Sequence, residues 1–324
     1  MSALMTSDQL AERTARARAA AVAAGRDLGW DVSAATVLHD VFSVVVHLAP
    51  SPVVVRVPTV LPRHVDAEQQ SAQQRVELDV AAWLAEQGVP VIPPSPLVAR
   101  EPVLRDGFSM TFWEFVEVDH DAEPDYARRC GSTAELHAAL RDYPGELPFL
   151  SAADPRMVTD ALADLAAYPE LITAVDLDRA RREWEVLGPV VGSRPEFEAV
   201  FPGVELQVIH GDAPAVNIVP TSGGELFSDF ELATLGPVEW DLASFGPEGE
   251  AVYEKEARRR GLRGLDERVL RFVNAVGMLR AVSCLALAPQ LPMLADAVGP
   301  AVEHWRATPF AGGLDELLTG SPRG

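Results

Sequence analysis

Cysteine and long apolar runs are scarce in this chain of 324 residues. The two cysteines, Cys130 and Cys284, lie near no other metal-binding residue type in the sequence, so neither a disulfide framework nor a zinc–cysteine site is expected. No run of about 18 apolar residues occurs, and the N-terminal segment alternates charge with alanine instead of forming an apolar core before a cleavage site. A soluble cytoplasmic protein without a membrane partner is therefore expected.

Basic residues are also few, and almost all of them are arginine. There are 27 Lys and Arg against 48 Asp and Glu, which gives a formal net charge of -21. Nucleic acids and anionic membranes bind basic surfaces, so no nucleic acid partner is expected, whereas a cationic small molecule would be tolerated. Lys255 is the sole lysine, so any phosphate-binding site must be built from arginine.

Apolar residues, in contrast, make up 48% of the chain, which suffices for one large domain or for two lobes that share a cleft. The first third predicts a helix with Ser7 as its N-cap and Gly25 near its end. Two β-branched strands over residues 35–49 and 52–58 then form a hairpin with a turn around Pro50 and Pro52. A helix over 66–87 and a strand over 108–118 follow.

Helical patterns dominate from residue 132 onward. Helices are expected over 132–142, about 155–168, about 177–188 and at several places between 248 and 306. The exception is the region 204–230, where short β-like segments alternate with loops. A β-rich first third, a connector near 117–131 and a helical remainder predict an α+β fold with two lobes.

The strand VVVRVP places Arg56 among valines. On its own, Arg56 would be interpreted as an edge-strand arginine whose guanidinium reaches water. In the next helix, however, Glu77 falls within the apolar stripe of Val80 and Leu84, and a glutamate there needs a buried cation. An Arg56–Glu77 pair is what a bilobal kinase uses to hold nucleotide phosphates, although an ordinary structural ion pair would leave the same pattern.

The stretch VIHGDAPAVNIV, residues 208–219, sets ionisable and amide groups among small and apolar residues. Asp212 and Asn217 are followed, twelve residues after Asn217, by Asp229. Two loops at the ends of short strands thus present one catalytic carboxylate and two oxygen ligands for magnesium. Phosphoryl transfer needs little more, because its catalysis consists mainly of positioning and charge neutralisation.

The motifs HGDAPAVN, SDFE and EWDLA, in this order, resemble the signature of the aminoglycoside phosphotransferase family, relatives of protein kinases that phosphorylate small molecules. The resemblance spans most of the chain, from VVVRVP through QRVELDVAAWLAEQGVPV and MTFWEFVE to STAELHAAL and WDLASF. It implies a bilobal protein-kinase-like fold, with a small antiparallel-sheet N-lobe in residues 1–116. Residues 117–324 would form a mainly helical C-lobe that carries the catalytic loop and the acceptor site.

The resemblance also implies roles in catalysis. Asp212 matches the catalytic base, and His210 would brace the catalytic loop. Asn217 and Asp229 match the magnesium ligands. Asp241 resembles a position that stabilises the loop, so its role is interpreted as structural.

For the nucleotide, the resemblance implies that Arg56 and Glu77 form the phosphate-clamping pair. Glu114 to Val116 match the inter-lobe hinge, whose backbone would meet the adenine edge. The turn that would cover the nucleotide, residues 38–46, has no glycine, so its backbone approaches phosphates less easily than a glycine-rich loop. Ser43 is a candidate phosphate donor there, although it equally fits a strand residue.

The sequence departs from the family within the catalytic loop. Pro214 and Val216 stand where the family often has another polar residue and a glycine. His137 sits among helix formers and is interpreted as a packing histidine rather than a ligand. Trp305, late in the helical region, is a candidate for the lining of an acceptor pocket.

The leading hypothesis is a phosphotransferase that uses ATP, or GTP, and Mg²⁺ to phosphorylate a hydroxyl of a small molecule, an aminoglycoside-like antibiotic or a metabolite. A resistance enzyme and a metabolic kinase would share these features, and the protein could be a monomer or a homodimer. The alternative is a pseudokinase or nucleotide-binding regulatory module without transfer activity. A metal-dependent phosphoesterase is the weakest hypothesis, because this region offers a single histidine.

Overall fold

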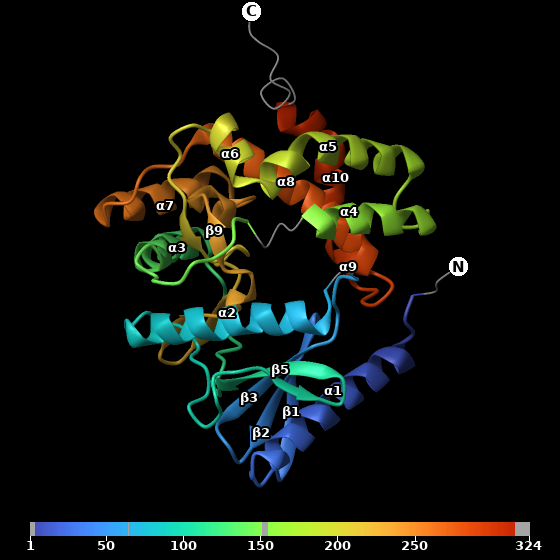
Figure 1. Ribbon diagram of the computed structural model, residues 1–324, viewed down its shortest axis with the longest axis vertical. Helices are drawn as coiled ribbons and strands as arrows, with labels where there is room; N and C mark the ends of the chain where they lie inside the picture. Colours follow the sequence, from blue (N-terminus) through green and yellow to red (C-terminus); the bar gives the residue numbers. More distant parts are fainter. Residues whose placement is uncertain (1–3, 64, 151–154, 315–324) are drawn as a thin grey trace, which may run out of the picture.

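The computed structural model describes residues 4–63, 65–150 and 155–314, which form two lobes (Figure 1). The N-lobe is built on one antiparallel sheet with the strand order β1-β2-β3-β5-β4. Its strands are β1 (Ala34–Asp40), β2 (Ser43–Ala49), β3 (Val53–Pro58), β4 (Val103–Arg105) and β5 (Phe108–Glu114). Helices α1 (Ser7–Asp27) and α2 (Ala67–Glu86) lie on opposite sides of this sheet.

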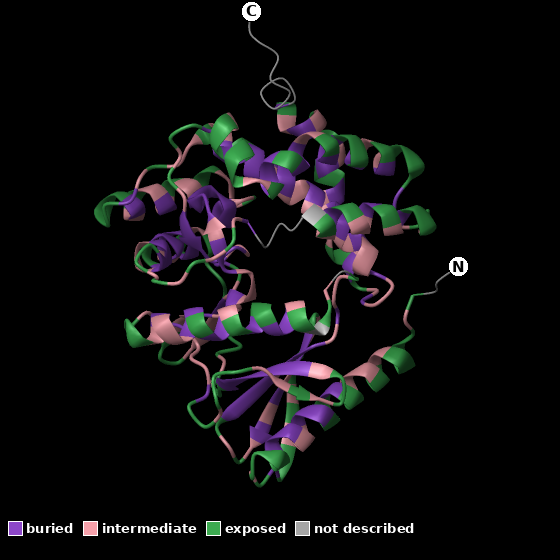
Figure 2. Cartoon of the chain, viewed as in Figure 1, coloured by how far each residue is buried: buried purple, intermediate pink, exposed green. Residues whose placement is uncertain are grey.

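The two faces of the sheet differ in chemistry because side chains alternate along each strand. Val53, Val55 and Val57 of β3 are buried against the alanines of α1, and Figure 2 shows this interior in purple. Arg56 lies between them in sequence and therefore points to the opposite face, toward α2. The face that carries the charged group is thus the one that looks into the space between the lobes.

Two N-lobe predictions were wrong in detail. The N-cap of α1 is Thr6 rather than Ser7, because the Thr6 side chain and Gln9 form a reciprocal capping box. As expected, Gly25 lies near the end of the helix, which ends at Asp27; a Cβ there would lie 2.8 Å from Leu48 Cδ1, so this glycine permits close packing against the sheet. The segment 35–49 is two strands, β1 and β2, because the chain reverses at residues 41–42 without a glycine.

The C-lobe is mainly helical. Its helices are α3 (Tyr126–Leu140), α4 (Pro155–Asp164), α5 (Ala174–Gly192), α6 (Arg194–Val200), α7 (Gly246–Arg259), α8 (Glu267–Cys284), α9 (Leu294–Ala297) and α10 (Gly299–Ala307). The 3-10 turns are η2 (Leu165–Ala167), η3 (Phe230–Leu232), η4 (Val238–Leu242), η5 (Leu285–Leu287) and η6 (Phe310–Gly313). Two small hairpins complete the lobe: β6 (Gln207–Ile209) with β9 (Thr234–Gly236), and β7 (Ile218–Thr221) with β8 (Gly224–Phe227).

The C-lobe corrects three expectations. Helix α3 begins at Tyr126 instead of residue 132, because the Asp125 side chain caps it by accepting a hydrogen bond from the Arg128 amide. Strand β9 lies beyond the predicted β region, which ended at residue 230. Trp305 lines no pocket, because it is 1% exposed and its indole N–H donates to Glu183 Oε2 at 2.6 Å.

Helix α8 with η5 is long and apolar enough to cross a membrane by composition, with a mean hydropathy of 1.5 over Glu267–Leu287. Its apolar side chains, however, lie in the largest hydrophobic cluster of the C-lobe, together with α5, α6 and α10. This is the arrangement of a core helix rather than of a membrane span.

Among the described residues, apolar side chains of the two lobes pack together at two separate places, in addition to the ion pairs that Arg56 and Arg63 make with the C-lobe. Next to the chain connection after β5, α2 packs on α3 and the small hairpins through Leu78, Val80 and Leu84. At the far end of α2, Val41 and Val60 of the N-lobe pack on η5, α9 and the residues between them. Three hydrogen bonds accompany this second inter-lobe contact: Met5 N to Pro289 O, Arg13 Nη1 to Gln290 O, and Gln290 Nε2 to Leu61 O.

Candidate active site

The first half of the site, which the sequence predicts to bind the nucleotide, is a charge cluster built on β3 and α2. Arg56 Nη1 donates to Glu77 Oε1 at 3.1 Å and to Oε2 at 3.0 Å, and Glu77 is 1% exposed. The structure thus brings together the two residues that the alternation of β3 and the apolar stripe of α2 had pointed toward each other.

Two further carboxylates share the same arginine. Arg56 Nη2 lies 3.0 Å from Asp229 Oδ1 and 2.7 Å from Glu231 Oε2. Sequence reasoning missed Glu231; its position two residues after Asp229, in SDFE, is the signal that could have found it. The charge of this cluster is therefore not balanced, with three carboxyl groups around one guanidinium.

The crowding of carboxylates is visible in their pKa values. Burial raises the pKa of Glu77 from 4.5 to about 8 against the opposing effect of Arg56, and Glu231 and Asp229 add to the rise. Burial likewise raises the pKa of Glu231, whose charge Arg56 favours and Asp229 disfavours. The cluster is therefore electrostatically unsatisfied and would gain from a second cation.

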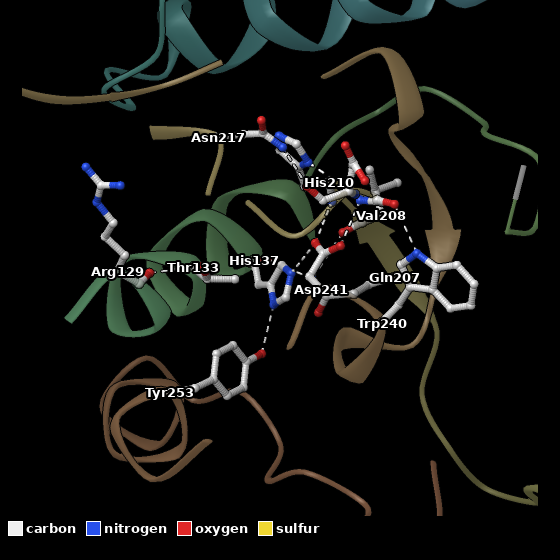
Figure 3. Close-up of polar contacts among 12 residues, drawn as sticks. Arg129, Thr133, His137, Gln207, Val208, His210, Asn217, Trp240, Asp241 and Tyr253 are labelled. Atoms are coloured by element: carbon white, nitrogen blue, oxygen red, sulfur yellow. Dashed lines mark hydrogen bonds and ion pairs between the residues drawn. The ribbon is translucent and has the colours of Figure 1, made fainter. Parts of the chain in front are cut away.

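The catalytic-loop half of the site is held by one buried aspartate (Figure 3). Asp241 of η4 accepts hydrogen bonds from the backbone N–H of His210 and of Gly211, both at 2.8 Å. The indole N–H of Trp240 donates to the Gly211 carbonyl at 3.0 Å. The loop that follows β6 is thus fixed by side chains that are far from it in sequence.

His137 of α3 extends this network. Its Nε2 lies 2.9 Å from Asp241 Oδ2, and its Nδ1 lies 2.9 Å from the Tyr253 hydroxyl. A carboxylate accepts hydrogen bonds, so His137 donates to it from Nε2, while Nδ1 is paired with the Tyr253 hydroxyl. The prediction that His137 packs in the interior is confirmed, and the structure adds that it supports the carboxylate that holds the catalytic loop.

His210 is fully buried and joins the two loops of the site. Its Nε2 lies 2.9 Å from the Ser228 carbonyl, and its Nδ1 accepts from the Asp212 amide at 3.3 Å. These contacts place the ring beside the loop rather than in the open cleft. His210 therefore holds the two loops in position, since its ring is hydrogen-bonded to a backbone group of each loop.

The Asp212 carboxylate is the exposed group of this loop. Its side chain is 44% exposed, and its nearest charged neighbour is Arg280 of α8, with 3.9 Å between Nη2 and Oδ1. No hydrogen bond to this carboxylate is observed within the described part of the chain. A carboxylate that is held by its backbone and open at its oxygens can accept a proton from a substrate hydroxyl.

Strained backbone surrounds this carboxylate. Gly211 has φ +86°, and a Cβ there would lie 2.0 Å from the Leu232 carbonyl oxygen, so only glycine fits. Ala213 and Asp229 also have positive φ, 45° and 66°. Such conformations in non-glycine residues cluster at functional sites, where the surrounding structure enforces them.

The predicted magnesium ligands lie on the two loops that His210 connects. Asn217 Nδ2 donates to the Asp212 carbonyl at 2.6 Å, which orients the amide and leaves its Oδ1 for a ligand. Asp229 Oδ1 is buried and contacts Arg56, yet makes no hydrogen bond in the described structure. This oxygen donor set fits Mg²⁺, which binds through one or two carboxylates plus phosphate oxygens. No group of three or more His, Cys, Asp or Glu that could hold a metal by itself occurs among the described residues.

The remaining predicted residues lie along the edge of the cleft. Ser43 is buried at the start of β2, where it opposes Pro58, and it shares the sheet face of Arg56. Glu114 ends β5, and its amide donates to the Pro93 carbonyl. The Val116 amide makes no hydrogen bond to a described residue, so it is open to a ligand at the connection between the lobes.

Beside Asp212 lies a cavity of about 700 Å³ between the second inter-lobe contact, α4 with η2, and the end of α8. Its wall is rich in alanine and also includes Tyr168, Cys284 and Arg280. Sequence reasoning did not single out Arg280, because its proximity to Asp212 spans 68 residues and leaves no local pattern. Its closeness to the open carboxylate makes this cavity the candidate acceptor site.

Comparison with known proteins agrees with this geometry. Residues 44–273 match the family model described as the phosphotransferase enzyme family. No curated protein sequence matches at a significant level.

Several solved structures are similar to the chain at low sequence identity. A choline/ethanolamine kinase family protein from Mesorhizobium loti has a TM-score of 0.55 and 20% identity, with 95% of this chain and 100% of that chain covered. The amicoumacin kinase hAmiN, in complex with AMP-PNP, Ca²⁺ and Ami, has a TM-score of 0.56 and 14% identity, with 90% of each chain covered. The GDP and kanamycin complex of APH(2")-IIia has a TM-score of 0.54 and 16% identity, with 86% and 93% covered. At these identities the likeness establishes the fold, a kinase-like arrangement of two lobes.

Proposed function

The chain belongs to the phosphotransferase enzyme family and is a small-molecule O-phosphotransferase, and we propose that it transfers the γ-phosphoryl group of ATP or GTP, with Mg²⁺, to a hydroxyl of its acceptor. The single observation that carries this proposal is that Arg56 lies against Asp229, while Asp212 and Asn217 lie on the loop that His210 joins to the Asp229 loop. Phosphoryl transfer requires a carboxylate at the acceptor, oxygen donors for the metal and a cation at the phosphates, and these residues supply each of them.

In the proposed mechanism Asp212 accepts the proton of the acceptor hydroxyl. His210 and Asp241 hold its loop so that the carboxylate keeps one position, which favours a near-attack geometry. Mg²⁺, when bound by Asn217 and Asp229, supplies charge neutralisation at the phosphates.

Arg56 then has a second role besides its pairing with Glu77. It lies against Asp229 and Glu231 in the structure, and a nucleotide phosphate is a better partner for a guanidinium than two crowded carboxylates. We propose that Arg56 turns its Nη2 from these carboxylates to the phosphates, while Nη1 stays on Glu77. Ser43 would donate to a phosphate, and the backbone of Glu114 and Val116 would bind the adenine edge at the boundary of the lobes near residue 116.

The alternative is a pseudokinase that binds a nucleotide without transfer. Asp212, Asn217, Asp229, Arg56 and Glu77 are all present, whereas a kinase that has lost transfer activity is expected to lack at least one of them. The acceptor is proposed to be a hydroxyl-bearing small molecule, an aminoglycoside-like antibiotic or a metabolite, so a role in antibiotic resistance is included.

Both cysteines are free thiols, which supports a cytoplasmic location.

The test is Mg²⁺-dependent ADP release from ATP across a panel of aminoglycosides, macrolides, sugars, amino alcohols and hydroxy acids. Asp212→Ala should abolish turnover and largely keep MgATP binding, whereas Asp229→Ala should abolish Mg²⁺-dependent binding. Turnover with one acceptor that is lost in Asp212→Ala supports transfer. MgATP binding without turnover of any acceptor supports the pseudokinase, and equal loss of binding in both variants contradicts the assigned roles.

A further inference from the structure

The wall of the candidate acceptor cavity places one arginine beside the Asp212 carboxylate. Arg280 of α8 lines the cavity, and its Nη2 lies 3.9 Å from Asp212 Oδ1, which is beyond hydrogen-bond distance. Its guanidinium lies 5.4 Å from the centre of the Trp240 ring, on which it is supported. The arginine is therefore held in place next to the open oxygens of Asp212 without being satisfied by them.

Arg280 also retains hydrogen-bonding capacity. Its Nε is buried and makes no hydrogen bond to any described residue, and an unpaired buried N–H is costly. The nearby Cys284 does not act as its anion, because burial raises the pKa of that thiol. The Arg280 side chain as a whole is 21% exposed, so the exposed part of its guanidinium remains open to a ligand that presents acceptor oxygens.

The described side chains that line the cavity carry equal numbers of positive and negative charges. Two arginines and two aspartates line it among the described residues, namely Arg63, Arg280, Asp160 and Asp164. Asp164 is paired with Arg63 at 2.5 Å. The described wall of the cavity therefore lacks the surplus of acidic residues that the whole chain has. The charged side chain next to Asp212 is that of Arg280.

We propose that the acceptor is a compact hydroxy acid, whose carboxylate is bound by Arg280 while its hydroxyl meets Asp212. Arg280 Nη2 and Asp212 Oδ1 are 3.9 Å apart, so one small molecule can reach both side chains when its hydroxyl and its carboxylate lie within a few bonds of each other. The alanine-rich wall suits a small apolar body. The guanidinium also offsets the repulsion between an anionic acceptor and the phosphates.

This inference rests on the proposed transfer activity and specifies its acceptor. A different role for Arg280 would be stabilisation of the transferring phosphoryl group. The two roles separate clearly, because an arginine that binds the acceptor's carboxylate affects only acceptors that have one, whereas an arginine on the phosphoryl group affects every acceptor alike.

The experiment compares glycerate, serine and 3-hydroxybutyrate with their amides, and with ethanolamine and kanamycin, in the wild type and in Arg280→Gln. We expect the wild type to prefer the acids, and Arg280→Gln to lower kcat/KM for the acids by roughly 10- to 100-fold, mainly through KM. The amides should change less than about threefold, and Arg280→Lys should restore part of the preference for acids. Arg271→Gln, which removes an exposed arginine from the same helix, is the matched control and should keep the acid-to-amide ratio.

Turnover restricted to amino alcohols or kanamycin would overturn the inference and leave the transfer activity standing. An equal loss for acids and amides in Arg280→Gln would overturn it in favour of a role at the phosphoryl group. If no acceptor is turned over, ligand-observed NMR with MgAMP-PNP present decides: acid binding that Arg280→Gln weakens supports the acceptor site even where transfer fails. Absent or unchanged acid binding overturns it.

Discussion

The two halves of the site are built in opposite ways. On the nucleotide side, one guanidinium is shared among Glu77, Asp229 and Glu231, so the charges are uneven and two partners are replaceable. On the catalytic-loop side, Asp241 and His137 form a buried network in which each described bond has a donor and an acceptor. In the first half, Arg56 can exchange two of its carboxylate partners for a ligand. In the second half, the hydrogen bonds of Asp241 hold the loop in one position.

The difference follows from what each half would do. A binding site for phosphates and a cation must lose contacts in order to gain new ones, so an electrostatic deficit in the free protein favours ligand binding. A catalytic carboxylate must keep its position while the substrate changes, and satisfied buried networks are rigid. The following predictions, from the largest effect to the smallest, test this contrast.

The rigid half should be the most sensitive to substitution. Asp241→Asn replaces one acceptor oxygen by a donor that faces existing N–H groups, so it should lower the free energy of unfolding by roughly 3 kcal/mol and kcat by about 100-fold. Urea unfolding and steady-state kinetics measure the two effects. Asp125→Ala, which removes the N-cap of α3, is the control and should cost about 1 kcal/mol with kcat unchanged. An Asp241→Asn protein with wild-type stability and turnover would show that the network is not rigidly coupled to the loop.

The exchangeable half should show strong coupling between its two core members. Arg56→Ala and Glu77→Ala should each weaken MgATP binding by a similar factor, and the double variant should bind little worse than either single one, with a coupling energy of about 1–3 kcal/mol. Calorimetric titration of the four proteins completes the cycle. Additive losses would mean that Glu77 does not act through Arg56.

The smallest effect concerns the pH dependence of stability. The pKa of Glu77 is raised from 4.5 to about 8 in the fold, so the folded chain binds this proton more strongly than the unfolded chain does. Its contribution to stability is therefore present at low pH and is lost as the pH rises from about 4.5 to about 8. Glu77→Gln should flatten the fall in unfolding free energy between pH 5 and pH 8. Parallel curves for the two proteins would contradict the raised pKa.

Those features of the site that depend on local periodicity could be predicted from the sequence. The alternation along β3 and the apolar stripe of α2 placed Arg56 and Glu77 correctly, and the pattern of apolar residues predicted the two lobes. The contacts of His137 with Asp241, 104 residues apart, and of Arg280 with Asp212 depend on how whole helices pack, and no local pattern encodes them. The N-cap at Thr6 was missed because the adjacent Ser7 is an equally suitable cap. The start of α3 was missed because its cap, Asp125, lies well before the predicted start at residue 132.

The second inter-lobe contact limits how the lobes can move. A body joined to another at one point can rotate about any axis through that point, but one joined at two points rotates only about the line between them. Here the joints are the connection after β5 and the cluster of Val41 and Val60 against η5 and α9. Pro62, Leu287 and Gln290 of the second joint line the candidate acceptor cavity, and Arg56 reaches Asp229 and Glu231 across the lobes, so a rotation that alters one of these sites must alter the other. Occupancy of either site would then change the affinity of the other by the same factor.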